Sequence, residues 1–122
     1  MCGRYSLSKS IKKIAEHFKT RLIETGPWPR FNIAPTQSLP VVTNNSGDLE
    51  LQMMKWGLVP HWAKDASIGS RMINARAETV AEKPIFRDAF RSKRCLIPCD
   101  GFYEWVQGEN GKTPHYIRFK GG

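Results

Sequence analysis

The clearest periodic pattern lies near the start of the chain. Apolar side chains recur three or four positions apart there, which places them on one face of a helix. These side chains are Ile11, Ile14, Ala15 and Phe18. Ser8 and Ser10 precede them, and serine is a good helix N-cap. The pattern predicts an amphipathic helix over residues 8–19.

Two β-strands with a turn between them are predicted farther along the chain. Polar and apolar residues alternate over residues 49–56, and residues 39–43 are mostly apolar. The segment between them, Asn44-Asn45-Ser46-Gly47-Asp48, consists of turn-forming residues. We therefore expect a β-hairpin.

The remaining pattern predicts short elements separated by loops. Residues 56–62 hold two indoles, a glycine and a proline, which favour a shaped loop with Trp56 in the core and Trp62 more exposed. Short helices are expected near Val80 and over residues 84–90, where Pro84 suits the first turn. Extended segments or strands are expected at residues 30–36, from residue 72 toward 79, and at 93–98, 102–107 and 114–120.

Composition adds a strong charge imbalance to this picture. The 122 residues suit one domain, and 19 Lys and Arg against 11 Asp and Glu give a net charge of +8. A basic surface favours a polyanion such as nucleic acid, although a solvated basic surface without a ligand has the same composition. No apolar run is long enough to span a membrane, and no signal peptide is recognisable.

The three cysteines cannot all pair in disulfides. Cys95 and Cys99 are spaced C-x3-C without a matching histidine pattern, so we expect no zinc site and no other metal or cofactor. Reduced thiols fit a cytoplasmic or nuclear location.

Cys2 directly follows the initiator methionine. Removal of Met1 would leave a cysteine with a thiol of pKa about 8.5 beside an α-amine of pKa about 7.7–8.0. Such a pair can condense with an aldehyde to form a five-membered thiazolidine ring, which no internal cysteine can do. The alternative is an incidental residue in a frayed terminus.

Three further residues are candidates for chemistry. Glu104 lies among aromatic residues, where desolvation would raise the pKa of a carboxyl group toward that of a general acid/base. Asn74 could orient a substrate through its amide, and Arg76 could clamp a phosphate. Each has an ordinary alternative: a solvated glutamate, a capping asparagine and a surface cation.

Six ordered blocks together resemble the SOS-response-associated peptidase (SRAP) family, over the whole chain. They are Met1-Cys2-Gly3-Arg4-Tyr5, Phe31-Asn32-Ile33-Ala34-Pro35-Thr36, Lys55-Trp56-Gly57-Leu58-Val59-Pro60-His61-Trp62-Ala63, Ile73-Asn74-Ala75-Arg76-Ala77-Glu78-Thr79, Arg94-Cys95-Leu96-Ile97-Pro98 and Gly101-Phe102-Tyr103-Glu104-Trp105.

The resemblance implies an α+β fold with a barrel-like, mostly antiparallel sheet. It also implies sensing of abasic sites in single-stranded DNA, or at single-strand/double-strand junctions, through a thiazolidine crosslink to Cys2, with possible self-processing as a peptidase. Asn74 and Glu104 are then catalytic residues with Cys2. The implied DNA contacts are Arg4, Asn32, Pro35, Trp62 and Arg76.

The chain departs from the family in one respect. The family has a further catalytic histidine in a His-x-Arg-Met-Pro motif after the last block, and His17, His61 and His115 do not match that motif. We therefore expect residues 1–122 to be the N-terminal portion of a single SRAP domain.

Two other function classes remain open at this point. A non-covalent module that binds single-stranded nucleic acid, with a cold-shock-like or OB-like fold, would account for the charge and the aromatic residues. A cysteine peptidase with an internal Cys–His pair is the other class, but no such pair is recognisable.

Overall fold

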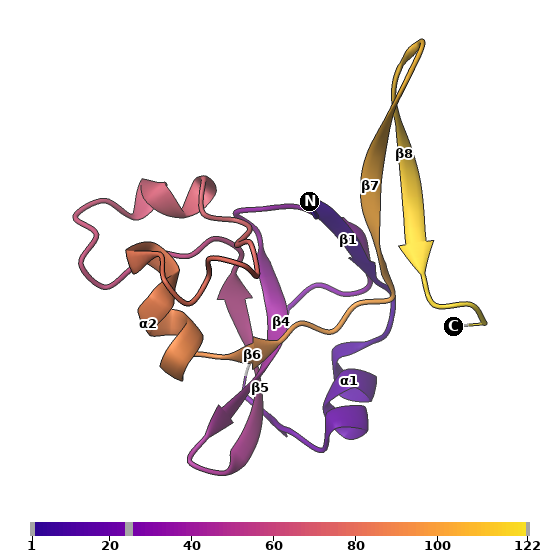
Figure 1. Cartoon of the computed structure of the whole chain (residues 1–122). Helices are drawn as coiled ribbons and strands as arrows, with labels where there is room; N and C mark the ends of the chain where they lie inside the picture. Colours follow the sequence, from indigo (N-terminus) through magenta and orange to yellow (C-terminus); the bar gives the residue numbers. More distant parts are fainter. Residues whose placement is uncertain (1, 24–25, 122) are drawn as a thin grey trace.

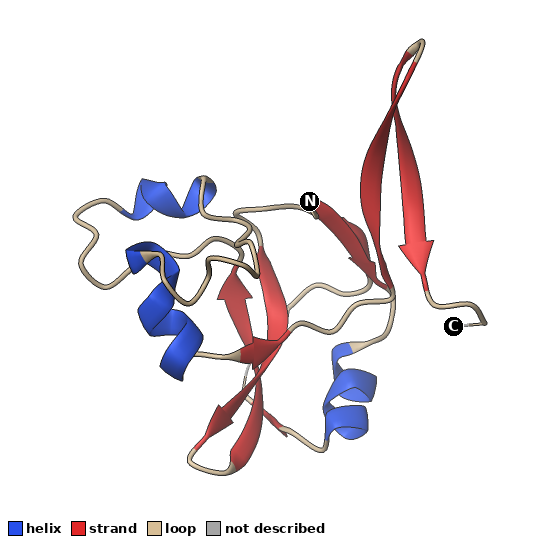
Figure 2. Cartoon of the chain, viewed as in Figure 1, coloured by secondary structure: helices blue, strands red, loops and turns tan. Residues whose placement is uncertain are grey.

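The computed structural model describes residues 2–23 and 26–121, which form an α+β fold with two four-stranded sheets (Figure 2). The first sheet has the order β3-β1-β7-β8, and all of its neighbouring strands are antiparallel. Its strands are β1 (Arg4–Leu7), β3 (Arg30–Ile33), β7 (Gly101–Gly108) and β8 (Gly111–Arg118).

The second sheet has the order β2-β5-β4-β6 and contains the hairpin that the sequence predicts. Asn45 pairs with Asp48, and Ser46 and Gly47 at the turn both have positive φ, as a two-residue hairpin turn of this kind requires. The strands are β2 (Arg21–Leu22), β4 (Ser38–Asn45), β5 (Asp48–Lys55) and β6 (Cys95–Leu96).

The expected barrel-like closure is not found, although the α+β class and the mostly antiparallel pairing are confirmed. The two sheets share no strand among the described residues. In Figure 1 the β7–β8 hairpin reaches away from the second sheet instead of closing onto it. The β6 strand is only two residues long, so it cannot extend the second sheet toward β8.

Two of the three predicted helices are present, with the expected start signals. The α1 helix (Ile11–Phe18) is capped by the Ser10 hydroxyl, which accepts a hydrogen bond from the Lys13 amide at 3.3 Å. The α2 helix (Pro84–Ser92) begins with proline, which lacks the amide hydrogen that a first helical turn leaves unpaired. A short 3-10 helix, η1 (Ala66–Ser70), lies in the loop after β5.

Two expectations between η1 and β7 are wrong. Turns cover residues 77–82, where a helix near Val80 was expected, and only Cys95–Leu96 of residues 93–98 form a strand. Residues 72–76 also lie outside regular secondary structure, so they are positioned by contacts with other segments.

The core joins both sheets to α1. The apolar face of α1 packs there, as its periodicity predicts, and Ile33 and Leu51 are fully buried. The buried side chains are Tyr5, Leu7, Ile11, Ile14, Ala15, Ile33, Leu39, Val41, Val42 and Leu51. Trp28 and Trp56 are partly buried against this cluster.

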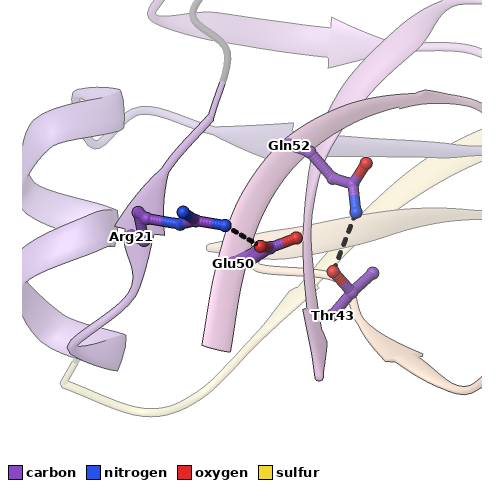
Figure 3. A network of polar contacts seen from close by, with 4 residues as sticks. All are labelled: Arg21, Thr43, Glu50 and Gln52. Carbon is purple, nitrogen blue, oxygen red and sulfur yellow. Dashed lines mark hydrogen bonds and ion pairs between the residues drawn. The ribbon is translucent and has the colours of Figure 1, made fainter. Parts of the chain in front are cut away.

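Polar contacts fix the edge of the second sheet (Figure 3). The Arg21 guanidinium pairs with the Glu50 carboxylate, and Glu50 is a buried charged residue. The Gln52 amide donates to the Thr43 hydroxyl at 2.8 Å. The ion pair links the short parallel strand β2 to β5. It also gives the buried Glu50 carboxylate a partner, without which its burial would cost free energy.

Gly57 lies in the loop of residues 56–62, called the tryptophan loop below, and gives a direct test of how this loop is held. Its φ is +133°, and a Cβ built there would lie 2.3 Å from the Gly69 carbonyl oxygen. Gly57→Ala should lower the free energy of unfolding by about 2–4 kcal/mol in urea titrations, because it adds backbone strain and a steric clash. Gly108→Ala is the control, since its Cβ would meet only an ordinary contact at 3.5 Å. Equal effects of the two variants would contradict this account.

Candidate functional site

Cys2 is held in place by the strand that follows it. The β1 strand lies between β3 and β7, and Tyr5 and Leu7 are buried in the core. Cys2 is therefore only two residues from an anchored central strand and is half-buried. Its thiol donates to the Arg4 carbonyl oxygen, with the sulfur 3.6 Å from that oxygen. A frayed terminus does not describe this arrangement; Met1 lies outside the described residues.

Asn74 contacts Cys2 although it lies 72 positions later in the chain. Its side-chain nitrogen donates to the Cys2 carbonyl oxygen at 2.7 Å. The segment before Asn74 is held by two hydrogen bonds: the Trp56 indole donates to the Ile73 carbonyl oxygen at 2.9 Å, and the Leu58 amide donates to the Met72 carbonyl oxygen at 3.0 Å. The hydrogen bonds from the tryptophan loop thus orient the side-chain amide of Asn74 toward Cys2.

Trp56 connects this loop to the rest of the core. Its backbone exchanges hydrogen bonds with residues 36 and 37, and its ring lies 5.7 Å from the Tyr5 ring. Trp62, in contrast, is 52% exposed. The predicted division between a packed and an exposed indole is confirmed.

Glu104 reaches the same site from β7. Arg4 pairs with Tyr103, so Glu104 lies beside the start of β1 and is half-buried. Burial is the main cause that raises the pKa of the Cys2 thiol, and the negative charge of Glu104 raises it further. The structure therefore brings Cys2, Asn74 and Glu104 together.

His115 lies next to this cluster, although sequence reasoning did not select it. It pairs with Glu104 in the β7–β8 register, and directly opposite residues in an antiparallel pair point to the same face. The sequence contains the information that would have selected it. If Gly108 and Gly111 pair across a two-residue turn, four further positions along each strand place Glu104 opposite His115.

The candidate DNA contacts fall into two groups. Arg4 and Asn32 are joined, since the Arg4 guanidinium donates to the Asn32 side-chain oxygen at 3.0 Å. The other three lie on loops: Pro35 is half-buried in the turn after β3, and Trp62 and Arg76 are exposed. Phe31 adds an aromatic surface beside Asn32 and is 62% exposed.

The other two cysteines take no part in these hydrogen bonds. Cys95 and Cys99 are free and exposed, and partial burial of their sulfur atoms raises the pKa of both thiols. Across the described residues, no group of three or more His, Cys, Asp and Glu side chains could hold a metal ion. Within the same residues, neither helix has the length and apolar character that crossing a membrane requires.

Comparison with known proteins places this arrangement in a family. The sequence profile of the SOS response associated peptidase (SRAP) family matches residues 1–122. The chain belongs to the SRAP family.

Named relatives of this SRAP chain are described as abasic site processing proteins. It is 44% identical to YoqW of Bacillus subtilis (strain 168), over 98% of this chain and 55% of the relative. It is 32% identical to HMCES of Xenopus tropicalis, over 75% of this chain and 31% of the relative. The chain thus spans about half the length of the Bacillus relative.

Solved structures match the fold as well. A protein from Bacteroides thetaiotaomicron superposes with a TM-score of 0.82 at 27% identity, over 99% of this chain and 56% of that chain. A phage-related protein from Bordetella bronchiseptica superposes with a TM-score of 0.67 at 28% identity, over 96% and 55% of the two chains.

The electrostatics of Cys2 predict how its thiol reacts. Because its pKa is raised, the reactive thiolate should be scarce at pH 8, and alkylation by iodoacetamide should be slower than for a free cysteine. Glu104→Gln should speed this alkylation at pH 8, since it removes a negative charge that raises the thiol pKa.

The measurement is mass spectrometry of each cysteine over time. Cys95 is the internal control, because burial alone raises its pKa and Glu104→Gln should leave its alkylation rate unchanged. An unchanged rate at Cys2 in the variant would contradict an effect of the Glu104 charge on the thiol.

Proposed function

We propose that this chain senses abasic sites in single-stranded DNA, or at single-strand/double-strand junctions, and binds them covalently through Cys2. The convergence of Cys2, Asn74 and Glu104 at the start of β1 is the observation that carries the proposal. Membership of the SRAP family and the names of its relatives support the same reaction. In this proposal residues 1–122 belong to a single SRAP domain.

The chemistry begins with the ring-opened sugar of an abasic site, which carries an aldehyde. After removal of Met1, the Cys2 amine attacks this carbon and water leaves, which gives an imine. The thiol sulfur then adds to the same carbon, and the thiol proton goes to the nitrogen. The product is a thiazolidine ring, and no oxidant or cofactor is consumed.

Each neighbouring residue has a role in this sequence. Glu104 takes the proton from the sugar hydroxyl and returns one to the ring oxygen, which opens the sugar. Asn74 is a positioning residue, because its amide holds the Cys2 carbonyl and thereby the direction of the amine. Removal of residues preceding Cys2 by the chain itself, as a peptidase, belongs to the same proposal.

The DNA strand is held by residues around this cluster. Arg4, with Asn32 holding its guanidinium, and Arg76 contact phosphates. Pro35 and the exposed Trp62 act as a wedge against a duplex or a stacked base. Such a reaction takes place where DNA is found, in the cytoplasm and nucleoid of a bacterium or in the nucleus of a eukaryote.

A non-covalent module for single-stranded nucleic acid is the second candidate, favoured by the net charge of +8 and by the exposed Phe31 and Trp62. Alkylation of the Cys2 thiol discriminates between the two candidates. It would prevent thiazolidine formation but would leave binding by charge and stacking intact.

The central test is the position of the adduct. Wild-type protein incubated with an abasic-site oligonucleotide should gain the mass of the DNA on Cys2, stable to heat. Cys2→Ala should abolish this stable adduct, while Cys95→Ala and Cys99→Ala should retain it, because an internal thiol has no adjacent amine. Mass spectrometry of the intact protein and of its peptides measures both. A stable adduct on Cys95 or Cys99, or one that survives acetylation of the N-terminal amine, would overturn the mechanism.

If Arg76 contacts DNA phosphates, its replacement should weaken binding to every base sequence to a similar extent. Arg76→Ala should weaken binding to unrelated oligonucleotides about equally and reduce the slope of log K against log salt by about 0.7, the value for one phosphate contact on a single strand. Fluorescence anisotropy at several salt concentrations measures this. A loss confined to one base sequence would be inconsistent with phosphate contact.

A further inference from the structure

A cavity of about 370 Å³ lies at the other end of β1 from Cys2. It is bounded by α1 and by residues 98–100, the segment that leads into β7 (Figure 1). Its floor is apolar, because Leu7 and Ile14 are buried core residues that also line it. Phe18 and Pro98 complete the apolar surface.

The walls of this cavity are fixed by hydrogen bonds. The Asp100 amide donates to the Ser6 carbonyl oxygen at 2.9 Å, and the Ser8 amide donates to the Asp100 carboxylate at 2.5 Å. The opposite wall, α1, is capped by Ser10 and packed into the core. The backbone segments on both sides of the cavity are therefore held by the fold.

One wall is basic. Lys13 and His17 are four residues apart on α1, which places them on one face of the helix, and Lys9 precedes the N-cap Ser10. All three nitrogen-bearing side chains line the cavity. Neither lysine forms an ion pair with any of the described residues, and both are exposed. Asp100 is the one carboxylate among the lining residues, and its negative charge is partly satisfied by the Ser8 amide.

We propose that this cavity binds one nucleotide of the DNA strand, with its phosphate against Lys9 and Lys13 and its base against the apolar floor. This inference rests on the proposed function, because it takes single-stranded DNA as the partner. The volume lies within the range of small-molecule sites, about 300–1,000 Å³. Bases stack readily on aromatic side chains such as Phe18, and lysine is a common phosphate ligand.

The position of the cavity fits a second contact for the same strand. Lys9 is seven positions after Cys2, so an extended chain places them at most about 25 Å apart. A strand bound at Cys2 that extends over this distance therefore also reaches the cavity. Such a strand should lose affinity when these lysines lose their charge.

The chain offers a matched control for the test. Lys12 and Lys13 are adjacent on α1, both are exposed, and only Lys13 lines the cavity. Lys12→Gln and Lys13→Gln remove the same charge from the same helix. The probe is a labelled single strand of about 20 nucleotides without an abasic site, longer than the ~4–16-nucleotide footprint of common single-strand binding domains.

Lys13→Gln should weaken binding about five- to tenfold and make the slope of log K against log salt shallower by about 0.7. Lys12→Gln should change affinity less than about twofold. Adding Lys9→Gln to Lys13→Gln should double the change in slope. Thermal unfolding confirms that each variant is folded.

Equal losses for Lys12→Gln and Lys13→Gln on the long strand would overturn the inference, since they would mean that only overall charge matters. An unchanged salt slope in Lys13→Gln would also overturn it. Neither result touches the crosslink, which is measured separately as the yield on a short abasic-site oligonucleotide. Conversely, absence of a crosslink in the wild type would refute the proposed function and leave this comparison of binding intact.

Discussion

The pairing of β1 between β3 and β7 is the constraint on which the rest of the site depends. A chain terminus normally frays, because few contacts offset the entropy of ordering it. Here Tyr5 and Leu7 are buried, and burial of a leucine side chain contributes about 1.5–3 kcal/mol. The ladder then fixes where the neighbours lie: Arg4 is opposite Tyr103, so Glu104 comes to the start of the strand. Cys2 is positioned by a central strand although it is the second residue of the chain.

The tryptophan loop supplies the second fixed side of the site. Residues 72–76 have no regular structure of their own, yet Asn74 must be held for its amide to meet the Cys2 carbonyl oxygen. The Trp56 indole does this by bonding the neighbouring Ile73 carbonyl, and Trp56 itself packs on Tyr5. A single core contact thus couples the two segments. The close approach of Gly57 to Gly69 keeps this loop compact.

The sequence predicts the local elements well and the long-range contacts poorly. Ser10 and Pro84 mark helix starts, and Ser46 with Gly47 marks a hairpin turn, because these residues act within a few positions of themselves. The two-residue β2 and β6 strands are too short to carry a period, and they exist only because β5 and β4 lie beside them. The Asn74 contact joins residues 72 positions apart, which no local pattern encodes. Position and local composition made Cys2, Asn74 and Glu104 candidates, but only the family motifs favoured them over their ordinary alternatives. The expected barrel closure was wrong because strand order, too, is set by distant contacts.

The raised pKa of the Cys2 thiol is consistent with the proposed order of steps. A thiolate is the form that reacts with oxidants and electrophiles, and while Met1 is attached burial and the charge of Glu104 both favour the protonated Cys2 thiol. The price is a weaker nucleophile. Ring closure tolerates this, because the imine forms on the adjacent amine of the same residue and the attack is intramolecular, where effective concentrations of about 10⁵–10⁸ M are reached. A site that depended on the thiol to capture the aldehyde from solution would need the opposite electrostatics, with a cation and not a carboxylate beside the sulfur.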